Sequence, residues 1–380
     1  MKKKYIVLSI ITLVLLITFV TSFNYFKTSN NYVEDSVNNQ TKITKGISMN
    51  LEQTAGAGDY KQVTQSNWPT EGYKFNAELS KCENGGEISW DDTKKAVIVS
   101  GNLSDKCYVY FDIYQLTLAE YIKSQYTGTQ GENNIYYHDS SLANGAGDNS
   151  YRYAGASDSV NNYICLGSDA TTCPDANLFR IIGVFGNQTK VIRAKSVGYQ
   201  QWHTSADNTW SSSSLNAYLN GTYLTSLGTI AEKIATTTWK VGGGSWSNIV
   251  TSVPKTAYKN EVGSSASTTI IDKKIGLMYV SDYGFAASPS AWTKILGDYD
   301  GTDANGTSIK TINWMYMGYN EWTISRHFDN TNSAFFVNST GNVLGSNVRS
   351  DNGVRPSFNL ESSVKYVSGS GSMSDPVRVN

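Results

Sequence analysis

The chain of 380 residues is poor in charge, in histidine and in the short motifs of the common enzyme classes. Charged side chains make up 17% of it, below the roughly 25% of ordinary soluble domains, and the net charge is −1. Without a basic stripe, nucleic-acid binding has no electrostatic basis. The patterns G-x-S-x-G, H-E-x-x-H, the P-loop and G-x-G-x-x-G do not occur. The sequence therefore excludes nucleic acid as a partner and disfavours the common hydrolase and nucleotide-binding classes.

Only three histidines are present, at positions 138, 203 and 327. We expect His138 to be exposed in a polar linker and His203 to be a surface residue of a loop. His327 lies near Ser325 and Asp329, but catalytic triads are assembled from distant positions, so this cluster is weak support for an active site. The sequence thus favours a protein that is not an enzyme.

The N-terminus carries an apolar run, Tyr5–Phe26, which follows Lys2, Lys3 and Lys4. Its 22 residues, at roughly 1.5 Å of rise each, cover the hydrocarbon core of a bilayer. The lysines place the N-terminus in the cytoplasm. We expect a single-pass signal-anchor at residues 1–27, with the membrane as partner and the body outside the cell. The alternative is secretion after signal cleavage, for which Val20-Thr-Ser22 is a fair match.

Four cysteines form two local pairs, Cys82 with Cys107 and Cys165 with Cys173. Outside the cytoplasm such pairs usually oxidise, so the sequence predicts two disulfides. A zinc site is the alternative, but neither the spacing nor a nearby histidine supports it.

Composition shifts divide the body into four regions. Residues 28–58 are polar and are expected to be a spacer. Residues 59–114 alternate short strand-like runs with turn signals, which predicts a small disulfide-bonded antiparallel β module. Residues 115–150 are expected to hold a short amphipathic helix at 116–126, followed by a linker.

Residues 151–380 are expected to form one large α+β domain. The patterns predict strands at 178–182, 189–193, 274–280 and 334–337, and helices at 213–219 and 224–235. Seven of the nine tryptophans lie here. We expect most of them in the core and a few on loops as recognition platforms, because Tyr and Trp with Ser, Gly and Asn are typical of paratopes.

Several stretches of this region carry a family resemblance. They are Tyr151-Arg-Tyr-Ala-Gly155, Asn161-Asn-Tyr-Ile-Cys165, Asn177-Leu-Phe-Arg-Ile-Ile-Gly-Val184, Asn320-Glu-Trp-Thr323 and Gly353-Val-Arg-Pro-Ser-Phe-Asn-Leu360. They resemble an uncharacterised family of secreted and surface proteins of low-GC Gram-positive bacteria. That family is similar in pattern to the C-type-lectin-like fold in its formylglycine-generating branch. The resemblance implies a C-type-lectin-like C-terminal domain.

The activity of the formylglycine-generating enzymes does not carry over. It requires a late pair of reactive cysteines, and no cysteine follows Cys173. The sugar-binding motifs of true C-type lectins are absent too. The expected fold class is α+β, with an N-terminal transmembrane helix, a small β module and the C-type-lectin-like domain.

The resemblance also implies where a ligand binds, because such a head presents its ligand through long late loops. Here these loops lie between Glu321-Trp-Thr323 and Val354-Arg-Pro356. The candidate ligand-binding residues, all expected to point outward, are Arg326, His327, Asn330, Asn332, Asn347 and Arg349. An ordinary hairpin with solvated polar tips is the alternative.

One segment has the composition of a cation site. Asp298, Asp300, Asp303 and Asn305 lie close together with glycines between them, and Ca²⁺ takes 6–8 oxygen ligands. A solvated loop of Asx-turns is the alternative. No other cofactor is expected.

Arg355 is expected to be buried and paired, with Pro356 ending a core strand. Together the patterns predict a membrane-anchored extracellular protein that binds or displays, with a protein or glycan ligand. The alternative is an extracytoplasmic enzyme on the same fold.

Overall fold

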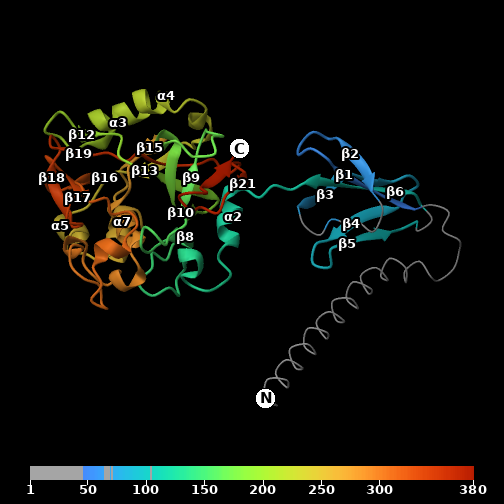
Figure 1. The fold of residues 1–380 in the computed structure, drawn as a ribbon, viewed down its shortest axis with the longest axis horizontal. Helices are drawn as coiled ribbons and strands as arrows, with labels where there is room; N and C mark the ends of the chain where they lie inside the picture. Colours follow the sequence, from blue (N-terminus) through green and yellow to red (C-terminus); the bar gives the residue numbers. More distant parts are fainter. Residues whose placement is uncertain (1–45, 64–68, 70–71, 103–104) are drawn as a thin grey trace, which may run out of the picture. The chain divides into compact units, whose positions relative to one another are not determined.

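The computed structural model describes residues 46–63, 69, 72–102 and 105–380 (Figure 1). The chain divides into two compact units, Met1–Gln115 and Leu116–Asn380. Both contain more strand than helix, and the expected α+β class is confirmed. No helix within the described ranges is long and apolar enough to span a membrane. The predicted anchor at 1–27 lies outside those ranges.

The N-terminal unit contains a mixed sheet with the strand order β2-β1-β6-β3 and a separate hairpin of β4 and β5. Its strands are β1 (Ile47–Glu52), β2 (Tyr60–Val63), β3 (Tyr73–Cys82), β4 (Glu87–Asp91), β5 (Ala96–Ser100) and β6 (Cys107–Ile113). Buried Met49, Leu51, Val109 and Phe111 form its core. The first predicted disulfide, Cys82–Cys107, is confirmed, and joins residues directly opposite each other on β3 and β6 with 4.0 Å between their Cα atoms.

Two features of this unit differ from the expectation. Strand β1 falls inside the segment 28–58 that we expected to be a spacer. It pairs in parallel with β6, so the module is not purely antiparallel. The apolar residues Ile47, Met49 and Leu51 alternate with polar ones, and this period of two places Met49 and Leu51 in the core.

The C-terminal unit contains a nine-stranded sheet with the path β15-β20-β11-β10-β9-β22-β21, to which β7 and β8 are added through β10. A smaller sheet has the order β12-β19-β16-β17-β18, and β13 pairs with β14. The strands of the larger sheet are β7 (Ile135–His138), β8 (Ser150–Tyr153), β9 (Tyr163–Cys165), β10 (Leu178–Phe185), β11 (Gln188–Arg193), β15 (Ile275–Gly276), β20 (Ser357–Asn359), β21 (Tyr366–Ser368) and β22 (Val377–Val379). The others are β12 (Tyr199–Gln201), β13 (Thr237–Lys240), β14 (Ile270–Lys273), β16 (Glu321–Arg326), β17 (Ser333–Val337), β18 (Val343–Asn347) and β19 (Asp351–Gly353).

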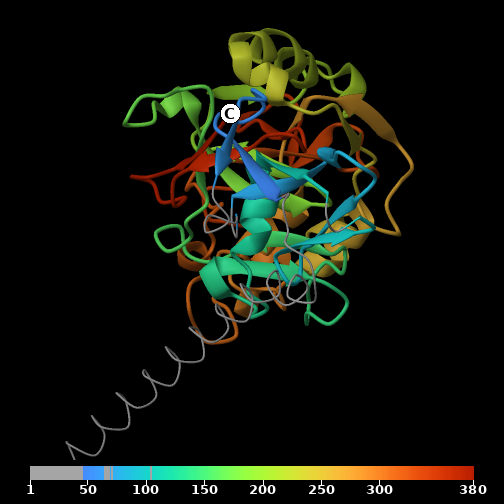
Figure 2. The ribbon, with the colours of Figure 1, turned by 90° about the vertical axis from the view of Figure 1, so that its right-hand side faces the viewer.

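Short helices connect these strands. They are α2 (Leu118–Ser124), α3 (Ser214–Tyr218), α4 (Leu224–Ser226), α5 (Trp246–Ile249), α6 (Pro254–Glu261) and α7 (Val280–Ala286). The yellow-green segment of α3 and α4 keeps to one side of the unit in both views (Figures 1 and 2). The expected helix 224–235 is confirmed only as α4 and a following 3₁₀ segment, Gly228–Lys233.

Three further expectations are corrected. The region 115–150 contains the expected helix as α2, but no linker follows it, because strand β7 joins the larger sheet through β8. His138, expected to be exposed, is fully buried. The expected strand 274–280 is limited to β15, and α7 begins at Val280, where Asp282 accepts a hydrogen bond from the Tyr279 amide as in a capping box.

Arg355 is buried and paired, as expected. Its Nε donates to Glu321 Oε1 over 2.6 Å, and one terminal nitrogen donates to Glu321 Oε2 over 2.9 Å and to the Met315 carbonyl over 2.8 Å. The expectation for Pro356 was wrong, because it precedes β20 instead of ending a strand. A residue without an amide hydrogen fits there, just before a strand that pairs on both sides.

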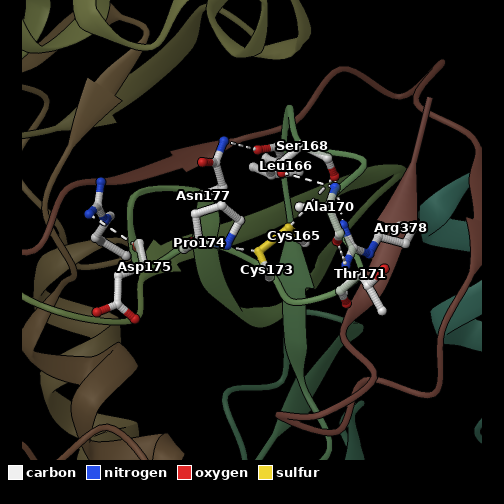
Figure 3. The surroundings of a disulfide bond; sticks show 11 residues. Cys165, Leu166, Ser168, Ala170, Thr171, Cys173, Pro174, Asp175, Asn177 and Arg378 are labelled. Atoms are coloured by element: carbon white, nitrogen blue, oxygen red, sulfur yellow. Dashed lines mark hydrogen bonds between the residues drawn. A yellow bond between two sulfur atoms is a disulfide. The ribbon is translucent and has the colours of Figure 1, made fainter.

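The second predicted disulfide, Cys165–Cys173, is confirmed and closes a loop beside the C-terminal strand (Figure 3). Arg378 on β22 lies next to Cys165 on β9. Its guanidinium donates to the carbonyls of Ser168, Ala170 and Thr171 over 2.6, 2.7 and 3.3 Å. The disulfide loop and the end of the chain thus stabilise each other. Two disulfides are consistent with an extracellular protein.

Candidate recognition surface

The candidate ligand-binding residues lie at one end of the smaller sheet. In the antiparallel register of β17 and β18, Ser333 lies opposite Asn347. The loop before β17 and the turn after β18 therefore meet, and the Val348 amide donates to the Asn332 carbonyl over 2.9 Å. The structure thus brings the exposed residues Asn330, Asn332, Asn347 and Arg349 to the same end of this sheet.

Arg326 and His327 do not point freely outward as expected, because both are partly buried. The Arg326 Nε donates to the Gly242 carbonyl over 3.0 Å. The His327 ring stacks on Phe335, with 5.2 Å between ring centroids and 20° between the planes. These two residues hold the loop in place, and the positions around them are exposed to solvent.

The loop between β16 and β17 is held by hydrogen bonds from Asn208, which is fully buried. Its Nδ2 lies 2.7, 2.9 and 2.7 Å from the carbonyl oxygens of His327, Asn330 and Ser333. The two N–H groups of this amide thus face three carbonyls of the turn, each of which also accepts a backbone amide of the same loop. The loop is held in one conformation before any ligand arrives.

A second segment, residues 242–246, binds the same loop from the side. The Gly244 amide donates to the Arg326 carbonyl and the Phe328 amide donates to the Gly244 carbonyl, both over 3.1 Å. Gly243 has a φ of +66°, and a Cβ there would lie 1.9 Å from the Arg326 oxygen. Glycine is required at this position by both the backbone conformation and the close approach.

This segment places Trp246 at the start of α5, beside β17 and β18 (Figure 1). An added Cβ on Gly345 of β18 would lie 3.5 Å from the indole, so the ring packs over that glycine. The indole is nevertheless 42% exposed, and Phe328 on the neighbouring loop is 47% exposed. Phe335 and Phe336 are buried, so the phenylalanines of this segment divide between surface and core.

Trp246 differs from the other tryptophans of this unit. Trp202, Trp210, Trp239, Trp292, Trp314 and Trp322 are all essentially buried. We call the exposed set Trp246, Phe328, Asn330, Asn332, Asn347 and Arg349 the Trp246 surface. Sequence reasoning did not single out Trp246, although the preceding run of glycines at 242–244 was a signal of a close backbone approach.

The candidate calcium residues make an ordinary turn. Asp303 is buried, and its Oδ1 accepts the amides of Asn305 and Thr307, each over 2.8 Å. A hydrogen bond from Ser290 and these amides lower the pKa of Asp303. Asp298 and Asp300 are exposed. Within the described ranges, no three His, Cys, Asp or Glu side chains are arranged to hold a metal ion, and calcium binding stays a prediction.

The other two histidines offer no exposed acid or base of clear function. His138 packs against Phe285 and Trp292, and burial lowers its pKa well below the usual value. Its Nδ1 accepts the Ala146 amide over 3.0 Å, which accounts for the neutral ring. His203 accepts the Ser214 amide over 3.3 Å at the end of α3. Both side chains are explained by local structure.

Comparison with known proteins adds one finding. No curated protein and no solved structure matches the chain. The segment 186–362 begins just before β11 and ends just after β20, so it contains every residue of the Trp246 surface. Residues 186–362 match a family model described as "Domain of unknown function (DUF6273)".

Proposed function

We propose that the protein is a membrane-anchored binding protein of the cell surface and that the Trp246 surface holds an extracellular glycan. The observation that carries the proposal is the exposed indole of Trp246 on a preorganised loop pair, in a unit whose other tryptophans are buried. Phe328 on the neighbouring loop is exposed as well, and exposed aromatic side chains rimmed by polar residues are typical of binding surfaces.

The neighbours of Trp246 fit a ligand rich in hydroxyl groups. Three exposed asparagines carry both donors and acceptors, and Arg349 adds donors only. The flat indole offers an apolar surface to the face of a sugar ring. The neighbouring amide groups offer hydrogen bonds to the hydroxyl groups at the edge of that ring. The fixed loop means that little conformational entropy is lost on binding.

The Trp246 surface suits binding better than catalysis. Its exposed side chains include no histidine or cysteine, and the neighbouring His327 is stacked on Phe335, so the exposed carboxylate of the same loop, Asp329, has no free imidazole beside it in this loop. The carboxylates with raised pKa, Glu261 and Glu321, are each 2% exposed, and burial causes both shifts. Such groups contact other protein atoms and not a substrate. This supports a binding role over the enzyme alternative.

A printed glycan array probed with the purified protein tests the proposal. We expect retained glycans on the wild-type protein and about a tenfold weaker signal on Trp246→Ala, the loss expected when about 1.4 kcal/mol of contact energy is removed. Tyr199→Ala is the matched control, because Tyr199 is 60% exposed and lies on β12 at the opposite edge of the same sheet.

Both variants should remain folded at the temperature of the array, because both side chains are exposed, and thermal unfolding of each variant checks this. Equal glycan signals for Trp246→Ala and wild type would contradict the proposed surface. If the purified protein retained no glycan on the array but bound surface proteins in a separate pull-down, the proposed ligand class would be wrong and the ligand would be a protein.

A further inference from the structure

A buried pair of oppositely charged side chains lies outside the Trp246 surface. Lys190 on β11 and Asp282 on α7 are 92 residues apart, and the Lys190 Nζ lies 2.5 Å from Asp282 Oδ2. The two side chains are 6% and 3% exposed. An amine and a carboxyl group are therefore held in contact in the interior of the C-terminal unit.

Aromatic rings surround the amine. The Lys190 Nζ lies over the rings of Tyr279, Trp239 and Phe185, at 4.6, 5.4 and 5.8 Å from their centroids. Loss of water lowers the pKa of Lys190, although the charges of Asp282 and Glu261 oppose the shift. Burial therefore favours the neutral amine, which is the nucleophilic form.

The carboxyl group is held by donors on its other side. Asp282 Oδ2 also accepts the Tyr279 amide over 2.9 Å. Asp282 Oδ1 lies 3.5 Å from a terminal nitrogen of Arg152, and Asp148 holds that guanidinium over 2.7 Å. Donors aimed at a carboxyl group stabilise the negative charge that develops on its oxygens when a nucleophile attacks the carbon.

We propose that Lys190 and Asp282 condense to form an intramolecular amide bond. The ammonium group passes one proton to Oδ2, and the neutral Nζ then forms a bond to Cγ. The second proton moves from nitrogen to the same oxygen, the Cγ–Oδ2 bond breaks, and one water molecule leaves. An ammonium and a carboxylate become an amide and water, so atoms and charge balance without a further reactant.

The amide bond has a physical advantage over the ion pair from which it forms. Two buried charges carry a large desolvation penalty, and the ion pair only partly offsets it. The amide is uncharged and joins β11 of the larger sheet to α7. Like a disulfide over a long loop, it restricts the unfolded chain, and unlike a disulfide it resists reduction.

Intact mass spectrometry of two reduced and unfolded variants tests the amide bond. Lys190→Arg and Lys195→Arg have the same atomic composition, so their masses differ only if one has lost atoms. Lys195 is the matched control, because it forms an exposed ion pair with Asp175 over 2.6 Å. We expect Lys190→Arg to be heavier by the mass of one water molecule, about 18 Da.

A tryptic digest of the wild-type protein gives the second measurement, and it does not depend on the folding of a variant. We expect one branched peptide that contains both Lys190 and Asp282. Equal masses for the two variants, together with separate wild-type peptides for these residues, would overturn the proposal. A water loss that maps to another residue would overturn it as well. Glycan binding does not enter either measurement, so the two proposals stand or fall separately.

Discussion

The buried ion pair of Arg355 and Glu321 gives the most quantitative prediction for stability. The two residues are 1% and 2% exposed, and the carboxylate accepts two of the three hydrogen bonds that the guanidinium makes. Glu321→Met keeps the approximate volume and removes both acceptors. Hydrogen bonds to charged groups contribute about 1.5–3 kcal/mol each, so the variant should lose about 4 kcal/mol, within the range for broken buried pairs.

The double variant Glu321→Met, Arg355→Met separates the cost of an unpaired charge from the cost of altered packing. It leaves no buried charge at this position, so its loss of unfolding free energy should be smaller than that of Glu321→Met alone. Urea unfolding followed by tryptophan fluorescence suits the measurement, because seven of the nine tryptophans lie in the C-terminal unit. A double variant that loses as much unfolding free energy as Glu321→Met, or more, would refute the reasoning.

The remaining predictions concern a disulfide, a buried histidine and a glycine. Cys173→Ser removes the disulfide to Cys165, which closes a short loop because the two cysteines are 8 positions apart. The variant should lose about 2 kcal/mol of unfolding free energy, measured in urea, and a loss near zero would contradict this. The pKa of His138 in the folded protein lies well below its usual value, so unfolding takes up a proton below about pH 6.5. His138 therefore lowers the unfolding free energy of the wild-type protein there by up to about 1.4 kcal/mol per pH unit. His138→Gln should lack that contribution, and parallel stability curves for the two proteins between pH 7 and 5 would argue against it. Gly243→Ala should cost about 3 kcal/mol because its Cβ would meet the Arg326 oxygen, whereas Gly186→Ala, with a similar φ of +64° but open space, should cost about 1 kcal/mol. Equal losses in thermal unfolding would show that backbone conformation alone decides.

Local patterns were sufficient for many elements. The strand-like runs and turn signals of residues 59–114 predicted a small β module, in which β4 and β5 form a hairpin. The cysteine pairs were close in the chain, so their disulfides were predicted with few alternatives. Arg355 in a chain so poor in charge indicated a buried partner, although the sequence could not identify it as Glu321. These predictions depend on neighbouring residues or on the general cost of burying charge.

Other features depended on contacts between distant segments. The sequence at 135–138 reads as a polar linker, and only its pairing through β8 with the larger sheet buries His138. The tryptophans look alike in the sequence, yet six are buried and Trp246 is exposed. Lys190 and Asp282 meet although they are 92 positions apart in the chain. The sequence by itself determined several of the strands, the two disulfides and the scarcity of catalytic motifs, because these follow from composition and spacing along the chain. Only the tertiary structure decided which indole faces solvent and which charges are buried together, because exposure depends on the segments that pack around a residue.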